Sequence, residues 1–311
     1  MSFSSKVKEE ISQSAINARH CQLASLRAFL QFCGRIDNSE EGKGLYIETD
    51  NAIIYRKCFT ILRKTFNIMT VTGQSAEESP TNGHYRIYIE DSDDIWNIIQ
   101  SLKLMDNGVL EPFSAPVNSL LLKSSCCKRA YIKTVFLCIG SVSDPNKGYH
   151  LELVCDREDQ GRQILGILKD FNIEAKLISR KKYYVVYIKE AECIVDFLNV
   201  CEAYVALMDL ENLRIVKDVR NNINRQVNCD TANIAKVVNA AARQIEDIKL
   251  LEAKGVFNDL SYGLREMAQI RLEHPDEPLN ELGRYFDPPL GKSGVNHRLR
   301  KLSEIASEYR L

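Results

Sequence analysis

Residues 278–302 read PLNELGRYFDPPLGKSGVNHRLRKL. The first nine of these residues have the apolar spacing of a short helix, and the proline- and glycine-rich residues 287–291 predict a turn. A second helix follows, with one apolar edge and one basic edge. Two helices joined in this way are typical of a helix-turn-helix, whose second helix enters the major groove of DNA. DNA binding is therefore the first functional hypothesis.

The second helix of this motif divides its residues between two faces. One set at helical spacing is expected to face the core: Val295, Leu299, Leu302 and either Ile305 or Ala306. Ser293 is the expected N-cap, and Gly294 is the expected first helical residue. The predicted DNA contacts are the polar and basic residues that remain: Lys292, Ser293, Asn296, His297, Arg298, Arg300 and Lys301.

These predicted contacts suit different parts of DNA. Asn296 and His297 near the helix start suit base edges, and Arg300 could pair with guanine. The other basic residues are better suited to phosphates: Lys292, Arg298 and Lys301. No acidic residue lies between positions 292 and 301, so positive charge is concentrated there. The alternative interpretation is a solvated basic face on an ordinary terminal helix.

Length and composition indicate how many domains the chain has and where a DNA-binding site can come from. At 311 residues the chain is too long for one compact core, so two domains are expected. Hydrophobic residues make up 45% of the sequence and charged residues 27%, as in an ordinary globular protein. The net charge is −1, so any DNA-binding site must come from local clustering of Lys and Arg.

The sequence has ten cysteines, and no two of them have the Cys-x-x-Cys spacing of a zinc site. The adjacent pair Cys126-Cys127 is too constrained for an ordinary disulfide between its own members. Most of the others fall in apolar-periodic stretches: Cys21, Cys33, Cys58, Cys138, Cys155, Cys193 and Cys201. We therefore expect buried, reduced thiols, with no metal site and no cofactor.

The opening residues 1–10 are charged and lack the apolar core of a signal peptide. No run of the chain approaches the ~18 apolar residues that a membrane helix needs. The sequence therefore predicts a cytoplasmic protein with no membrane partner, associated with the nucleoid if it binds DNA.

Residues 1–200 contain an internal repeat. Residues 64–68 (KTFNI) recur as residues 169–173 (KDFNI). Each copy has the same order of predicted elements: a helix ending in glycine, a strand, a helix, a two-stranded hairpin and a closing helix. These lie at 23–34, 45–50, 51–66, 68–90 and 95–102 in the first copy, and at 130–140, 149–156, 158–171, 173–189 and 194–198 in the second. We predict an α+β domain of two αββαβα-like halves with antiparallel sheets, related by a pseudo-two-fold axis.

The two glycine-ended helices, residues 26–34 (LRAFLQFCG) and 132–140 (IKTVFLCIG), resemble the LAGLIDADG motif of homing endonucleases. In that family the two helices pack side by side, and an acidic residue before each final glycine binds the metals that cut DNA. Here those positions hold Cys33 and Ile139, and neither is a hard oxygen ligand for Mg²⁺. The resemblance therefore implies the fold and argues against nuclease activity.

Asp37 and Asp144 follow the two glycines by three and four residues, so they could be displaced metal ligands. The alternative is that they cap or solvate the loops into the next strands, as Asp commonly does. Gly34 and Gly140 themselves are interpreted as helix C-caps and close-packing positions.

After residue 200 the strand patterns stop, and the segment 220–233 is rich in Asn, which is a weak helix former. Such a segment is not expected in the interior of a helix, so we place the joint between domains here. The predicted division is a duplicated domain at 1–200, a helical, Asn-rich linker at 201–232 and an all-α domain at 233–311. The helix-turn-helix spans about residues 275–308.

Four residues of this joint form a second group of candidates: Arg220, Asn221, Asn224 and Arg225. Asn and Arg both suit phosphates and base edges, so the group could contact DNA or dock a domain. The alternative is a polar linker whose amides cap neighbouring helices.

Several segments together are similar to the WhiA family of Gram-positive bacteria. Residues 282–302 look like the family's signature, residues 225–233 match its linker pattern, and residues 140–151 match its second LAGLIDADG-like half. The opening residues 3–10 also fit, so the resemblance covers essentially the whole chain. It implies a catalytically silent LAGLIDADG-like domain joined to a helix-turn-helix similar to region 4 of sigma factors. Family members are transcription factors of sporulation in filamentous forms, and in others they affect cell division and chromosome segregation.

The resulting hypothesis is a sequence-specific, DNA-binding transcriptional regulator without enzymatic activity. Its expected partners are double-stranded promoter DNA and another transcription or cell-division protein. One alternative is a divalent-metal-dependent DNA endonuclease. The other is a protein-interaction module whose basic helix docks on an acidic cell-division partner.

Overall fold

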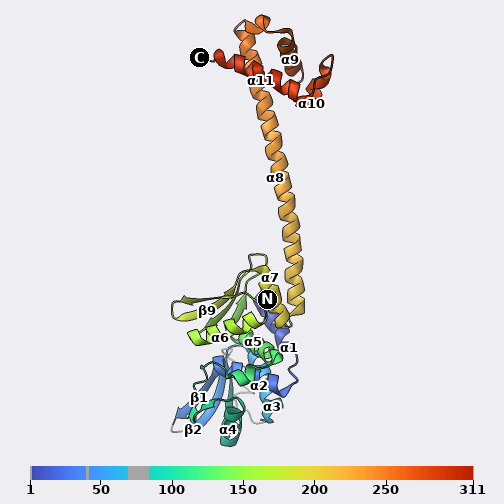
Figure 1. Cartoon of the computed structure of the whole chain (residues 1–311). Helices are drawn as coiled ribbons and strands as arrows, with labels where there is room; N and C mark the ends of the chain where they lie inside the picture. The colour runs from blue at the N-terminus through green and yellow to red at the C-terminus, as the bar shows by residue number, and fades with distance from the viewer. Residues whose placement is uncertain (1, 40–41, 69–83, 311) are drawn as a thin grey trace. The chain divides into compact units, whose positions relative to one another are not determined.

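The computed structural model describes residues 2–39, 42–68 and 84–310. By its internal contacts the chain divides into two units, Met1–Val216 and Lys217–Leu311 (Figure 1). Among the described residues, no helix combines the length and the apolar character needed to cross a membrane.

Unit 1 contains the expected repeat, preceded by helix α1 (Phe3–Gln13). The elements of the first half are α2 (Arg19–Cys33), β1 (Gly34–Ser39), β2 (Gly42–Thr49), α3 (Ala52–Phe66), β3 (Tyr85–Ile89) and α4 (Ser92–Ser101). Those of the second half are α5 (Ser125–Ile139), β6 (Gly140–Val142), β7 (Leu151–Cys155), α6 (Glu158–Asp170), β8 (Lys176–Arg180), β9 (Tyr183–Ile188) and α7 (Ala191–Val200). The α+β class with duplicated halves is therefore confirmed.

Between the halves lie the short hairpin β4 (Met105–Asp106) and β5 (Val109–Leu110) and the 3-10 helix η1 (Ser119–Leu122). The two larger sheets are antiparallel, with strand orders β1-β2-β3 and β6-β7-β9-β8. The second half is thus αββαββα, one strand more than expected. The expected first strand of the hairpin at 68–90 falls largely on residues 69–83, which lie outside the described residues.

Strands β1 and β6, which were not predicted, begin at the two motif glycines. Gly34 pairs with Ile47 and Gly140 pairs with Leu153, so each helix passes directly into a strand. Both glycines end their helices as expected, but with extended backbones (φ −85° and −86°). Glycine is therefore required at these positions by close packing and not by a left-handed backbone. A Cβ at Gly34 would lie 2.6 Å from the Leu30 carbonyl oxygen, and one at Gly140 would lie 2.7 Å from the Phe136 carbonyl oxygen.

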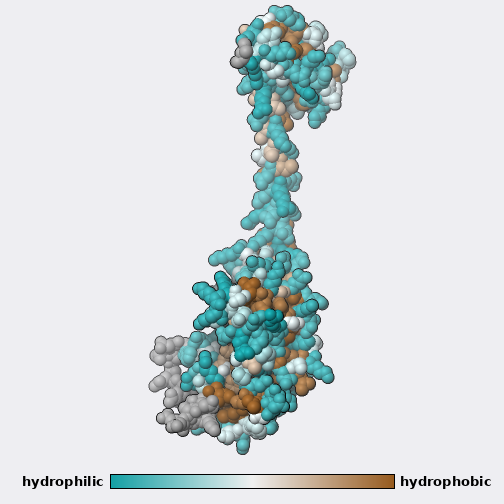
Figure 2. All heavy atoms as spheres, turned by 60° about the vertical axis from the view of Figure 1, so that its left-hand side comes forward, coloured by the Kyte–Doolittle hydropathy of each residue, from teal (hydrophilic) through white to brown (hydrophobic). Residues whose placement is uncertain are grey.

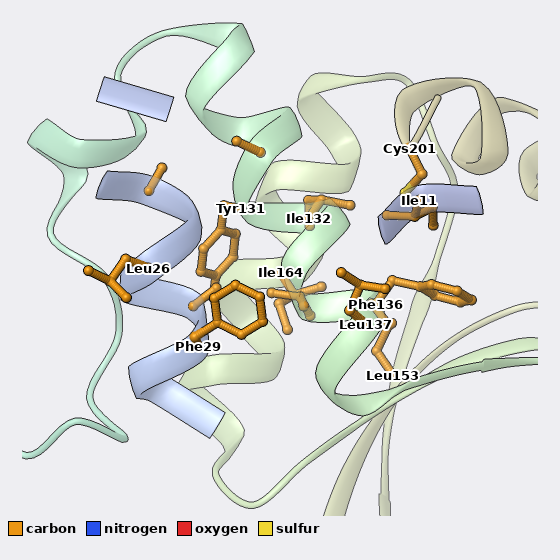
Figure 3. Packing of buried hydrophobic residues seen from close by; sticks show 14 of the residues in the cluster. Ile11, Leu26, Phe29, Tyr131, Ile132, Phe136, Leu137, Leu153, Ile164 and Cys201 are labelled. Carbon is orange, nitrogen blue, oxygen red and sulfur yellow. The ribbon is translucent and has the colours of Figure 1, made fainter. Parts of the chain in front are cut away.

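Helices α2 and α5 pack against each other through the centre of unit 1 (Figure 1). Figure 3 shows the rings of Phe29 and Tyr131 together at this contact, and both residues are fully buried. The hydroxyls of Ser25 and Thr134 lie 2.6 Å apart across it. Two small polar side chains at matching places let the helices approach closely without leaving a buried hydroxyl unpaired.

A buried arginine joins this helix pair to the segment between the halves. Arg27 is 1% exposed, and its guanidinium donates to the carbonyl oxygens of Phe113 (2.9 Å) and Ala115 (2.8 Å). Gln31 donates to the same Ala115 carbonyl and accepts from the Tyr131 hydroxyl. Burial lowers the pKa of Arg27, but the hydrogen bonds to carbonyls compensate the cost of placing a cation in the core.

Helix α8 (Tyr204–Ala253) includes the whole Asn-rich segment, so the expectation that this segment avoids a helix interior is wrong. Residues 217–240 are almost all exposed, and water therefore satisfies the amides that would otherwise compete for the backbone. The large apolar residues of α8 between positions 215 and 238 lie on one helical face and are between 52% and 64% exposed: Ile215, Val216, Val219, Ile223, Val227, Ile234, Val237 and Val238. In the view of Figure 2, pale spheres are scattered among hydrophilic ones along the exposed part of α8.

Unit 2 is all-α. After α8 come the 3-10 helix η2 (Val256–Asp259), α9 (Tyr262–Glu273), α10 (Leu279–Leu282), the 3-10 helix η3 (Gly283–Tyr285) and α11 (Lys292–Glu308). Its core gathers one set of side chains from these helices: Ile248, Leu251, Met267, Ile270, Leu282, Phe286, Val295, Leu299 and Leu302.

We expect Gly34→Ala to lower the stability of unit 1 by about 1–3 kcal/mol, because the new methyl group would overlap the turn at Leu30. Gly166→Ala is the matched control. Gly166 is an exposed residue of α6 with open space at its Cβ, so alanine there should stabilise by about 0.5–1 kcal/mol. Urea unfolding followed by the fluorescence of Trp96, the single tryptophan, measures both. Equal midpoints for the two variants would contradict the packing role of Gly34.

Candidate nucleic-acid interface

Helix α11 presents a polar face opposite its buried one. Val295, Leu299, Leu302 and Ala306 are buried, as the sequence predicts. The helix begins at Lys292 after the N-cap Gly291, so the predicted cap at Ser293 is wrong. Ser293 instead lies in the first turn, because the chain already has helical geometry at Lys292. The N-cap residue Gly291 makes no side-chain hydrogen bond to the first turn of the helix.

The structure brings six of the seven predicted contacts together as exposed side chains of α11: Lys292, Ser293, Asn296, His297, Arg300 and Lys301. Arg300 lies 3.3 Å from Glu304, one turn further along the same face. Both side chains are largely exposed, so this ion pair contributes little and leaves the guanidinium available. Unit 2 has a predominantly hydrophilic surface in the view of Figure 2.

Arg298 differs from the other predicted contacts. Its guanidinium lies 4.9 Å from the centre of the Phe286 ring and donates to the Gly263 carbonyl oxygen at 3.2 Å. The Glu266 carboxylate is 4.0 Å away. These contacts hold Arg298 between α9, α11 and the turn, so its role as a phosphate contact stays a prediction that the geometry does not favour.

A close backbone approach sets the turn that precedes α11. The Leu290 N–H donates to the Gly283 carbonyl oxygen at 2.9 Å. A Cβ at Gly283 would lie 2.1 Å from the Leu290 carbonyl oxygen, so no other residue fits here without movement of the chain. Phe286, 4% exposed, anchors the turn in the core of unit 2.

Arg271 fixes the segment between α9 and α10. It is 2% exposed, and its guanidinium donates to Gln244 of α8 at 3.0 Å and to the Glu277 carbonyl oxygen at 2.7 Å. Burial lowers the pKa of this group. No sequence pattern suggested this role, because the partners are a backbone carbonyl and a residue 27 positions away.

The second group of candidates lies on α8. The side chains of Arg220, Asn221, Asn224 and Arg225 are exposed. By helical spacing Asn221 and Arg225 lie opposite the apolar face, whereas Arg220 lies at its edge. They form a group separate from the residues of α11, and their predicted contact with DNA or with a domain stays a prediction.

The positions that hold carboxylates in LAGLIDADG nucleases lie at the C-terminal ends of α2 and α5. Here the thiols of Cys33 and Cys138 are hydrogen-bonded to each other, which lowers the pKa of Cys33. The ammonium group of Lys8, whose own pKa burial lowers, is close enough to favour the same thiolate. Ile139, half-buried, has no ligand atom. A thiol pair beside an ammonium group does not provide the oxygen ligands that Mg²⁺ prefers.

Of the two candidate displaced ligands, Asp144 accepts hydrogen bonds from the backbone and side-chain nitrogens of Asn146. It therefore shapes its loop in the way expected from the alternative interpretation. The side chain of Asp37 lies outside the described residues.

Comparison with known proteins covers almost the whole chain. Three family models match: the WhiA N-terminal LAGLIDADG-like domain at residues 19–105, the WhiA LAGLIDADG-like domain at 128–220 and the WhiA C-terminal HTH domain at 223–306.

Relatives and a solved structure agree with these models. A probable cell division protein WhiA of Lachnoclostridium phytofermentans is 44% identical, with 100% of each chain covered. One from Clostridium beijerinckii is 40% identical over 100% of this chain and 99% of its own. The crystal structure of "full-length DUF199/WhiA from Thermatoga maritima" is 24% identical over 99% of both chains, with a TM-score of 0.59, and shows the same fold.

We expect Gly283→Ala to loosen the turn before α11, because the methyl group would displace the Leu290 carbonyl. Hydrogen exchange of peptides covering residues 279–302 should become faster, while peptides of unit 1 stay unchanged. Gly291→Ala is the control, since open space surrounds the Cβ position and the φ of −71° suits alanine. Unchanged protection in Gly283→Ala would mean that this contact does not order the turn.

Proposed function

This chain belongs to the WhiA family, and from that premise we propose that it is a DNA-binding regulator of cell division that reads promoter DNA with helix α11. Chromosome segregation and sporulation are further processes in which such a regulator would act. The observation that supports DNA binding most directly is the exposed, basic face of α11, held at a fixed angle by the turn and by Arg298.

The proposed contacts divide by chemistry. Lys292 and Lys301 bind phosphates, whose negative charge they neutralise. Asn296 and His297 contact base edges, and Arg300 leaves Glu304 to pair with guanine in the major groove. The free energy needed to separate Arg300 from the exposed Glu304 carboxylate is small, because surface ion pairs are weak.

We also propose that the protein does not cut DNA. Two-metal cleavage needs carboxylates that hold Mg²⁺ and polarise the phosphate. The corresponding positions here hold Cys33 and Ile139, and the neighbours of Cys33 are the Cys138 thiol and the Lys8 ammonium group. The remaining role of unit 1 is to add a weaker DNA surface through its sheets or to hold a transcription or cell-division protein.

Lys292→Ala and Lys301→Ala should weaken duplex binding on every sequence and reduce the slope of log K against log salt by about 1 each. Asn296→Ala and Arg300→Ala should each weaken the binding free energy for the target sequence by about 1–3 kcal/mol, and should change binding to unrelated DNA little. Lys254→Ala is the matched control, because Lys254 is an exposed lysine that follows α8 and lies outside α11. Fluorescence anisotropy of the full chain at several salt concentrations measures all five. If the α11 variants bind as the control does, the helix does not enter the groove, and docking on an acidic protein becomes the better hypothesis.

Duplex DNA bound by the full chain should stay intact with Mg²⁺ or Mn²⁺, because no carboxylate stands at positions 33 and 139. Gel analysis of a supercoiled plasmid carrying the target detects single nicks. Metal-dependent nicking that Asp144→Ala or Asp37→Ala abolishes would establish displaced metal ligands and overturn this part of the proposal.

A further inference from the structure

Four potential metal ligands meet at the N-terminal ends of α2 and α5. They are His20, Cys21, Cys126 and Cys127, and one ligand atom of each lies within 4.8 Å of the other three. The His20 Nδ1 is 3.1 Å from the Cys127 Sγ, 3.3 Å from the Cys21 Sγ and 3.9 Å from the Cys126 Sγ. The cluster lies entirely within unit 1, at the opposite end of the helix pair from Gly34 and Gly140.

The spacing of these atoms is close to that of a zinc site. Tetrahedral Zn²⁺ has bonds of about 2.3 Å to sulfur and about 2.0 Å to nitrogen, which place neighbouring ligand atoms roughly 3.5–3.8 Å apart. The separations between the His20 Nδ1 and the three sulfurs lie on both sides of these values. Small side-chain rotations would therefore bring the four atoms to tetrahedral positions around one ion. Three sulfurs and one imidazole are a known ligand set of closed, structural zinc sites. Thiolates also select Zn²⁺ over Mg²⁺ or Ca²⁺.

We propose that His20, Cys21, Cys126 and Cys127 bind one Zn²⁺ ion, which ties the first turn of α2 to the first turn of α5. Nδ1 of the histidine and the three Sγ atoms are the ligands. The ion is structural, since four protein ligands leave no open position for water or substrate.

The position of the ligands at helix starts favours the thiolate form that a metal needs. His20 and Cys21 directly follow the first residue of α2, and Cys126 and Cys127 directly follow the first residue of α5. Neither first turn contains an acidic residue, and neither helix has a side-chain cap. The positive ends of two helix dipoles therefore point toward the cluster and stabilise its negative charge.

Burial differs among the ligands in a way that suits loading from solvent. Cys21 and Cys127 are buried, whereas His20 and Cys126 are exposed. Binding of Zn²⁺ by three thiols releases three protons and forms three Zn–S bonds and one Zn–N bond, with no change of oxidation state.

The sequence prediction of no metal site stays untested, and the proposed ligand arrangement is one that the sequence pattern does not reveal. Zinc sites are usually marked by ligand pairs at Cys-x-x-Cys spacing, whereas the proposed ligands are two adjacent pairs, with His20 and Cys127 107 positions apart. Only the packing of α2 against α5 brings the pairs together.

The test is a titration of reduced, metal-free full-length protein with Co²⁺, whose thiolate charge-transfer and ligand-field absorption reports tetrahedral sulfur ligation. We expect one Co²⁺ per chain, displaced by one Zn²⁺. Saturating Zn²⁺ should raise the Tm of unit 1 by about 5–10 °C.

Cys126→Ser and His20→Ala change exposed residues, so both variants should fold, which far-UV circular dichroism checks. Each should lose at least about tenfold in metal affinity and most of the Tm gain. Cys229→Ser is the matched control, because Cys229 is an exposed thiol of α8 outside the cluster and should leave binding unchanged.

Three results would overturn the proposal. The first is wild-type protein without the tetrahedral cobalt spectrum. The second is equal metal affinity in Cys126→Ser and Cys229→Ser. The third is a disulfide between Cys21 and Cys126 or Cys127 in protein purified under reducing conditions, since the oxidised sulfurs could not bind zinc.

Discussion

The close approach of α2 and α5 is the constraint on which unit 1 depends. Small polar residues, Ser25 and Thr134, hydrogen-bond where the two helices meet. Gly34 and Gly140 allow each helix to pass into the first strand of its sheet without a clash. Because the helices belong to different halves of the repeat, this one contact joins the two cores into a single one.

In this helix pair, the residues that packing needs differ from the residues that metal-dependent cleavage needs. Packing needs the helices and their glycines, whereas cleavage needs the carboxylates just before the glycines. This chain keeps the helices and the glycines, and it has Cys33 and Ile139 at the two positions before the glycines.

In unit 2, the corresponding constraint is the contact between Gly283 and Leu290. This contact sets the turn. Arg298, in the second turn of α11, then joins the helix to the Gly263 carbonyl of α9 and to the Phe286 ring. A basic helix alone would be a solvated surface. In α11 the apolar face is buried in the core of unit 2, and Arg298 is held by α9 and the turn. The opposite, basic face therefore has a defined orientation, which makes the helix a candidate for the major groove.

The sequence by itself determined the class of fold, the internal repeat and both faces of α11, because helical spacing, glycine position and charge pattern are local properties. It also determined the absence of carboxylates at positions 33 and 139. Tertiary structure decided what depends on distant partners. Strands β1 and β6 exist because β2 and β7 complete their hydrogen bonds, and Arg298 is held by residues of α9 and the turn. The grouping of His20 and Cys21 with Cys126 and Cys127 likewise arises only from packing of α2 on α5. No local pattern records such contacts, since their energy depends on chain segments that meet only in the folded state.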